Sequence, residues 1–170
     1  LHAGLYADAA ELLQRLVVAG VQPGSAYPLV HYYLGYLQQQ LGNPAAAAEC
    51  FARAAQMPTD YCFPFRLETA DVLQAALAVN PNDARAEYYL GNLLFDLQPD
   101  AAIEHWERSQ SLDASLAIVH RNLGWAYHHV RNDAAKAIAC YERALSCNQL
   151  EPRLFLELDV LYENANVAPD

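Results

Sequence analysis

The sequence has few glycines, a single lysine and no long apolar run. Its 170 residues include 7 Gly and 1 Met, and Lys136 is the one lysine. Charged or polar residues, proline and glycine interrupt every apolar stretch before it reaches the roughly 18 residues that a membrane-spanning helix needs. With 54% hydrophobic and 18% charged residues, the composition excludes a disordered or a collagen-like chain. We therefore expect one ordered domain with a sizeable core and no membrane as a partner.

Positive charge is scarce. The chain holds 10 Lys and Arg residues against 20 Asp and Glu residues, which gives a formal net charge of -10 at pH 7. A polyanion is bound by neutralising its charge with basic side chains. The balance disfavours both nucleic acid and anionic membrane surfaces, so we expect no nucleic acid as a partner.

No pair of cysteines has the C-x-x-C spacing. Cys50, Cys62, Cys140 and Cys147 stand singly in apolar context, so we expect four buried thiols in a reducing compartment, and hence a cytoplasmic location. The chain opens on Leu1 without a basic, then apolar, leader. It reads as a piece of a longer protein, on which a signal sequence is left open.

Motifs for catalysis or metal binding are missing as well. There is no G-x-S-x-G, no glycine-rich phosphate loop and no H-E-x-x-H. His128 and His129 are adjacent and His120 precedes them on the same helix face, but no third ligand follows at close spacing. We expect no catalytic residue, no metal and no cofactor. A deep pocket joining Cys62, Tyr61 and a histidine would favour an enzyme instead.

A pattern recurs three times along the chain. Residues 31–36 (HYYLGY), 87–92 (EYYLGN) and 120–125 (HRNLGW) share a Leu-Gly pair, and an alanine-rich stretch with one aromatic residue follows each. Small residues let two antiparallel helices approach closely, while the aromatic residues, Phe51, Trp106 and Tyr141, fill the space beside the contact. Because one such pair cannot bury its apolar face alone, successive pairs are expected to stack.

The recurring unit resembles the tetratricopeptide repeat, a helix-turn-helix unit of about 34 residues. The resemblance implies an all-α, right-handed solenoid of helix pairs with one degenerate, single-helix repeat, forming one superhelical domain over residues 1–170. Its expected units are a half-repeat at 1–24, a repeat at 26–58, the degenerate repeat at 59–82, repeats at 84–115 and 116–150, and a half-repeat at 152–170.

The degenerate repeat has a proline-bracketed segment where a first helix should stand. Pro58 and Pro64 enclose a stretch too short for a helix and biased to extended conformation. Tyr61, Phe63 and Phe65 then need burial, so we expect them to plug the space left by the missing helix. The alternative is that they shape a ligand pocket.

The periodicity and the break residues predict the helix boundaries. Asn and Asp residues stand ahead of several helix starts, as N-caps do, and no strand-period alternation is evident. The predicted helices cover residues 5–19, 27–41, 44–56, 66–80, 84–97, 100–112, 115–130, 133–147 and 152–164. The breaks between them include Gly20–Ser25 and Gln149–Pro152.

In this repeat family the first helices line the concave face and contact the ligand, which the resemblance implies here for a protein or peptide. The implied face is aromatic and carries three arginines, so an acidic and apolar partner segment is expected. The alternative for the tyrosines is packing on neighbouring repeats. The candidate binding residues are Tyr32, Tyr36, Arg85, Tyr88, Asn92, Arg121, Trp125, His128 and Arg153.

Two narrower resemblances were considered. One subfamily clamps the C-terminal carboxylate of a chaperone tail, but here Tyr88 replaces one cation of the clamp and Glu157 reverses another. The stretch from Asp60 to Asp96 also resembles the repeat region of large bacterial proteins with an N-terminal domain of unknown function. The second hypothesis is therefore a structural module that docks on its parent protein, or self-associates, through the half-repeats at its ends.

Overall fold

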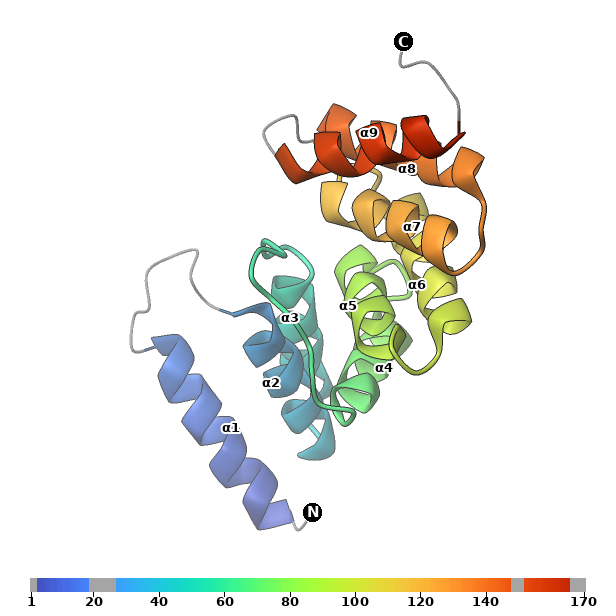
Figure 1. Cartoon of the computed structure of the whole chain (residues 1–170). Coiled ribbons are helices and arrows are strands. Elements are labelled where there is room, and N and C mark those ends of the chain that lie inside the picture. Colours follow the sequence, from blue (N-terminus) through green and yellow to red (C-terminus); the bar gives the residue numbers. More distant parts are fainter. Residues whose placement is uncertain (1–2, 19–26, 148–151, 166–170) are drawn as a thin grey trace. The chain divides into compact units, whose positions relative to one another are not determined.

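The computed structural model describes residues 3–18, 27–147 and 152–165 (Figure 1). The predicted breaks at Gly20–Ser25 and Gln149–Glu151 lie outside this part of the chain. Within it every regular element is an α-helix, and each predicted helix is confirmed to within a few residues at its ends. The helices are Ala3–Val18 (α1), Pro28–Gln40 (α2), Pro44–Ala54 (α3), Thr69–Val79 (α4), Ala84–Leu94 (α5), Pro99–Leu112 (α6), Ala117–His129 (α7), Ala134–Cys147 (α8) and Pro152–Ala165 (α9).

Local sequence explains where the helices begin. Proline opens α2, α3, α6 and α9, where its fixed φ suits the first helical position and its missing N–H costs nothing. The expected acidic N-caps form at two helices. Asp83 Oδ1 accepts from the amides of Arg85 and Ala86 at the start of α5, and Asp133 Oδ1 accepts from the amide of Lys136 in α8. Asn43, ahead of α3, makes no side-chain cap bond.

The chain forms two compact units, residues 1–93 and 94–170. In unit 1, α2 packs along α3, α1 contacts α2, and the single helix α4 contacts both α2 and α3. In unit 2, α7 packs along α8, with α6 against α7 and α9 against α8. The core between α8 and α9 consists of Ala137, Tyr141, Ala144, Leu154, Leu158 and Leu161.

Close helix approach rests on one glycine in each unit. A Cβ atom built on Gly35 of α2 would lie 2.4 Å from Phe51 of α3, and one built on Gly124 of α7 would lie 2.7 Å from Tyr141 of α8. These are the small and large positions that the repeated pattern predicts. The turns after α2 and α7 match too, since each holds one left-handed residue, Gly42 or Asn132.

The segment between α3 and α4 overturns one expectation. Tyr61, Phe63 and Phe65 are exposed rather than buried, while Cys62 and Pro64 between them are buried. An extended chain alternates its side chains between two faces, and here the small residues take the inner face. The aromatic residues therefore do not plug the space of a missing helix.

The cysteines correct a second expectation. Cys62 and Cys140 are buried, but Cys50 is half-buried and Cys147 is exposed at the end of α8; all four are free. Cys147 is the last residue of α8, and its Sγ lies 3.4 Å from the Ala114 carbonyl oxygen.

Candidate binding site

The first-helix positions of unit 1 are largely internal. Tyr32 of α2 is completely buried, and its hydroxyl donates to both carboxylate oxygens of Asp83, at 2.9 and 3.0 Å. Tyr88 of α5 is buried as well, with its ring centroid 5.1 Å from that of Tyr89. Both are core residues, and this corrects their assignment as ligand contacts. A tyrosine has enough apolar surface to be drawn into a core when its hydroxyl finds a partner.

The other candidates of unit 1 are half-buried. Tyr36 lies one turn after Tyr32 on α2, and Asn92 lies near the end of α5. The Arg85 Nε donates to the carbonyl oxygen of Met57 at 2.8 Å, so this side chain fastens the segment after α3 to the start of α5. These residues are not brought together into a cavity by the structure.

The candidates of unit 2 behave differently, because two of them line one cavity of about 300 Å³. Trp125 and His128 come from α7, and α9 supplies the opposite wall with Leu156 and Val160. Trp125 is 38% exposed, so its ring is accessible to a ligand. The full lining is Trp125, His128, His129, Tyr141, Leu156, Glu157, Val160 and Leu161.

Aromatic contacts hold the Trp125 side chain in place. Its ring stacks on His129 with centroids 4.1 Å apart, and Phe95 meets it edge-on at 5.5 Å. The Nδ1 of His129 lies 2.9 Å from the Trp125 carbonyl oxygen, one helical turn away. Since the ring is fixed from two sides, a ligand would meet a rigid aromatic surface at little cost in side-chain entropy.

Glu157, which lines the cavity, is paired with Arg121, which does not line it. Arg121 Nη2 of α7 donates to Glu157 Oε1 of α9 at 2.7 Å, with both side chains about one-fifth exposed. Burial, and then the negative charge of Glu157, raise the pKa of the Tyr141 hydroxyl above its ordinary value. Arg121 is thus already engaged by an acid of its own chain. Arg153, the remaining candidate, is exposed near the start of α9.

The polar groups of the cavity lining are two histidines, a tyrosine and a glutamate. Within the described residues, no group of three His, Cys, Asp or Glu side chains is placed to hold a metal ion. His120 is buried, with its two ring nitrogens 3.1 Å from Gln110 Nε2 and 2.9 Å from the Ala114 carbonyl oxygen. Tyr61 and Cys62 point to opposite sides of their segment, the first exposed and the second buried.

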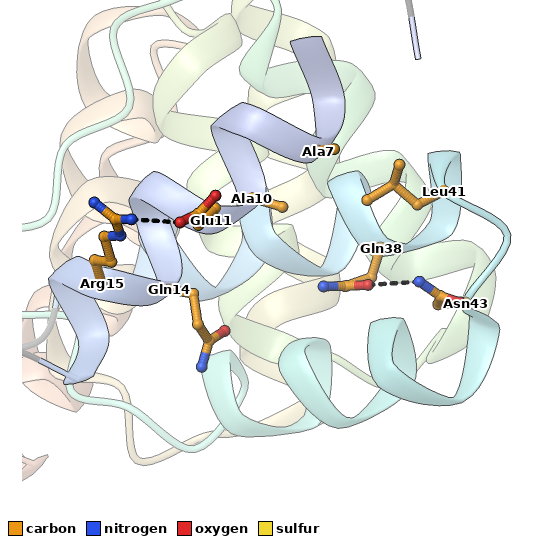
Figure 2. A pocket seen from close by; sticks show the side chains of 8 residues that line it. All are labelled: Ala7, Ala10, Glu11, Gln14, Arg15, Gln38, Leu41 and Asn43. Atoms are coloured by element: carbon orange, nitrogen blue, oxygen red, sulfur yellow. Dashed lines mark hydrogen bonds and ion pairs between the residues drawn. The ribbon is translucent and has the colours of Figure 1, made fainter. Parts of the chain in front are cut away.

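A larger and more open groove lies in unit 1 between α1 and the end of α2 (Figure 2), with a volume of about 840 Å³. Its polar side chains bond one another: Arg15 pairs with Glu11, and Asn43 Nδ2 donates to Gln38 Oε1 at 3.0 Å. Sequence reasoning missed this groove and the α9 wall of the cavity. The exposed apolar residues Leu156 and Val160, four apart on one helix, were the available signal for the latter.

Comparison with known proteins agrees with the helical-repeat fold. A family model described as tetratricopeptide repeat matches residues 1–61. The crystal structure of MamA superposes with a TM-score of 0.55 at 21% identity, over 96% of this chain and 81% of that one. The chain has the tetratricopeptide-repeat fold. In this chain the fold consists of helix pairs with close Gly–aromatic contacts, together with one single-helix repeat.

A further neighbour carries a ligand. The first tetratricopeptide-repeat domain of Spaghetti (RPAP3), solved with the HSP90 peptide SRMEEVD, has a TM-score of 0.51 at 16% identity, over 86% of this chain and 99% of that one. No curated protein matches the sequence significantly, and the family that matches is a repeat family rather than an enzyme family. No helix among the described residues is both long and apolar enough to cross a bilayer.

Proposed function

We propose that the chain is a protein- or peptide-binding module and that the cavity between α7 and α9 receives an apolar side chain of its partner. The observation that carries this proposal is the exposed, rigidly held Trp125 over a cavity with apolar walls on both helices. Tryptophan in a partly enclosed pocket is the side chain most often found to dominate binding energy. Peptide binding by the RPAP3 domain supports the same class of function at the level of the fold.

The charge pair sets the expected partner chemistry. An acidic group that bound Arg121 would compete with Glu157, with which Arg121 is paired. The displaced carboxylate would then lie without its cation, which is unfavourable at a mostly buried position. A neutral apolar anchor is therefore the better fit to the cavity, with any acidic group of the partner directed to the exposed Arg153.

The test uses peptides selected from a random eight-residue library on the intact chain, with binding followed by intrinsic fluorescence. Both tryptophans, Trp106 and Trp125, lie in unit 2, so a ligand in the cavity should shift the emission. Trp125→Ala should weaken binding about tenfold or more. Leu112→Ala is the matched control, because Leu112 is 39% exposed and does not line the cavity.

Filling the cavity provides a second variant. Val160→Trp places a large side chain in it from an exposed position on α9, and it should reduce binding while leaving Trp125 in place. If peptides bind equally to the wild type, Trp125→Ala and Val160→Trp, the cavity is not the site and the proposal fails.

A docking module is the second candidate, because one face of α1 is apolar and exposed. Leu5, Leu12 and Leu16 are each more than half exposed and recur at spacings of seven and four along the helix, which is the pattern of a face covered by a partner helix. The occupant would be another domain of a larger bacterial protein or a second copy. Light scattering should then show a mass that rises with concentration, and Leu12→Gln with Leu16→Gln should abolish the rise.

A reducing, cytoplasmic setting also belongs to the proposal. Cys147 is a free and exposed thiol, and such a thiol persists where the environment keeps it reduced.

A further inference from the structure

The segment between α3 and α4 presents a row of apolar side chains to solvent. Tyr61, Phe63, Phe65 and Leu67 are 90%, 62%, 81% and 63% exposed. Phe63 and Phe65 alternate with the buried Cys62 and Pro64 along an extended stretch and so share its outer face. Tyr61 and Leu67 stand in the turns at its two ends. With about 200 Å² for each aromatic side chain, the three rings alone expose on the order of 400–500 Å². Apolar patches of that size on soluble proteins commonly mark interaction sites.

Contacts on the inner face fix this presentation. Cys62 is completely buried, and burial raises the pKa of its thiol, with Tyr27 and Tyr89 beside it. The Tyr27 hydroxyl donates to the carbonyl oxygen of Phe63 at 3.2 Å. Tyr61 has a φ of 56°, a left-handed conformation that is unfavourable for a bulky residue. The aromatic row is therefore held outward by the segment's own anchoring.

An apolar cavity lies next to the row. It measures about 370 Å³, is open to solvent, and is lined within unit 1 by residues of α1, α2, the extended segment and the start of α4. Leu13, Leu29 and Val30 supply its aliphatic walls, and Phe65 connects it to the exposed row. The Tyr33 hydroxyl and Thr69 Oγ1, both in the lining, are 2.8 Å apart and bond each other. The cavity suits an apolar side chain, since its polar groups are already satisfied.

The charges around the row are mostly acidic. Asp60, Glu68 and Asp71 are exposed, and the nearby basic residues are the exposed Arg66 and the half-buried Arg85, whose Nε donates to the Met57 carbonyl oxygen. Arg66 Nη1 lies 3.5 Å from Glu68 Oε1, and its guanidinium lies over the Phe65 ring at 5.6 Å. The remaining carboxylates, Asp60 and Asp71, complement a basic partner. They also disfavour an anionic bilayer, for which exposed loop aromatics would otherwise be suited.

We propose that this face is a second binding site, for a protein segment that carries an aromatic or large aliphatic anchor next to Lys or Arg. The anchor enters the 370 Å³ cavity, the aromatic row covers the neighbouring apolar residues, and the acidic residues bind the basic side chain. The site lies entirely in unit 1 and does not depend on the cavity between α7 and α9.

The test selects from the same random eight-residue library, with the Trp125→Ala chain as bait so that the other cavity is disabled. The selected peptides should be enriched both in Phe, Tyr, Trp or Leu and in Lys or Arg. The variant Tyr61→Ser, Phe63→Ser, Phe65→Ser changes only exposed side chains, so it should fold normally and bind the selected peptides at least tenfold more weakly.

The matched control removes as many exposed apolar side chains from unit 2. Leu97→Ser, Leu112→Ser, Phe155→Ser should leave peptide binding unchanged. Amide NMR shifts on peptide addition should cluster in residues 27–33 and 61–69. A second variant, Val30→Trp, fills the cavity from a half-buried position of α2 and should weaken binding while the aromatic row stays intact.

Four results would overturn the proposal: no enriched peptide, enrichment in Asp or Glu, equal loss with the control triple variant, or shifts confined to unit 2. Binding of the wild type to phosphatidylcholine or phosphatidylserine vesicles, lost in the Ser triple variant, would assign the row to a membrane instead. Failure here leaves the Trp125 site untouched, because its peptides are selected and tested separately.

Discussion

The helix pairs α2–α3 and α7–α8 are built on one sequence pattern, yet the two pairs differ in what they expose. Tyr32 and Arg121 occupy the same place in the pattern, three residues before the glycine of each first helix. Each reaches an acid from a later element: Tyr32 the Asp83 that caps α5, and Arg121 the Glu157 of α9. The first contact is fully buried, and the second borders an open cavity.

The two helix pairs share the contact between the glycine and the aromatic residue, and they differ in the residue three places before the glycine. The glycine and the aromatic residue facing it set the distance between the helices, so both pairs need them. The residue three places earlier only needs a partner for its polar end. A neutral phenol can be buried with that partner, whereas a charged guanidinium stays close to water because of its desolvation cost.

Adding one methyl group at each glycine tests the glycine–aromatic contact that both helix pairs share. Gly35→Ala and Gly124→Ala should each destabilise the chain by about 1–3 kcal/mol, because the new Cβ overlaps a buried ring. The higher helix propensity of alanine offsets only part of this loss. Urea unfolding measures this, with tryptophan fluorescence reporting unit 2 and far-UV circular dichroism reporting both units.

Replacing the aromatic ring by a smaller aliphatic side chain provides the control for the glycine experiment. Phe51→Leu should recover part of the loss in the Gly35→Ala background, so the two changes should be less than additive. Additive losses, or a stabilising Gly35→Ala, would show that the ring does not set the helix distance.

The variable part is tested at the two equivalent positions. Tyr32→Phe should cost about 1–3 kcal/mol, because a buried carboxylate loses its side-chain donor. Arg121→Met also leaves a mostly buried carboxylate without its partner, but it should cost less, since Glu157 is 23% exposed and can be partly hydrated. Denaturant midpoints give both values. A larger loss at position 121 would reverse the comparison.

The smallest effect concerns pH. Burial raises the pKa of Asp83 above its ordinary value of 3.8, although hydrogen bonds from the Ala86 amide and the Tyr32 hydroxyl oppose the shift. The folded state then holds the proton more tightly than the unfolded state, so this group stabilises the fold at low pH and the contribution is lost as pH rises through its folded pKa.

The variant Asp83→Asn isolates that contribution. It should flatten the pH dependence of stability just above pH 3.8, the ordinary pKa, whereas Glu157→Gln serves as the comparison in unit 2. Stability curves of wild type and Asp83→Asn that stay parallel through this range would show that Asp83 titrates alike in both states.

Sequence reasoning recovered most of the fold because helices depend on local pattern. Leu-Gly pairs, alanine-rich stretches and break residues gave the order of the helices, and the proline-bracketed segment gave the single-helix repeat. Of the predicted binding residues, Trp125 and His128 of α7 line the 300 Å³ cavity, and their role in binding stays a prediction. The opposite wall of the cavity, on α9, was not predicted, because a local sequence pattern does not indicate which helix will lie opposite α7.

The same limit explains the errors. That Tyr32 is buried follows from a partner 51 residues away, and the outward direction of Tyr61, Phe63 and Phe65 follows from the burial of Cys62 and Pro64 beneath them. The sequence by itself determined the helices, their pairing and the close Gly–aromatic contacts, since these follow from spacing along one chain segment. Only the tertiary structure decided which aromatic side chains face solvent. Burial depends on residues that are distant in the sequence, and the spacing of the repeats does not predict which of them will pack on a given side chain.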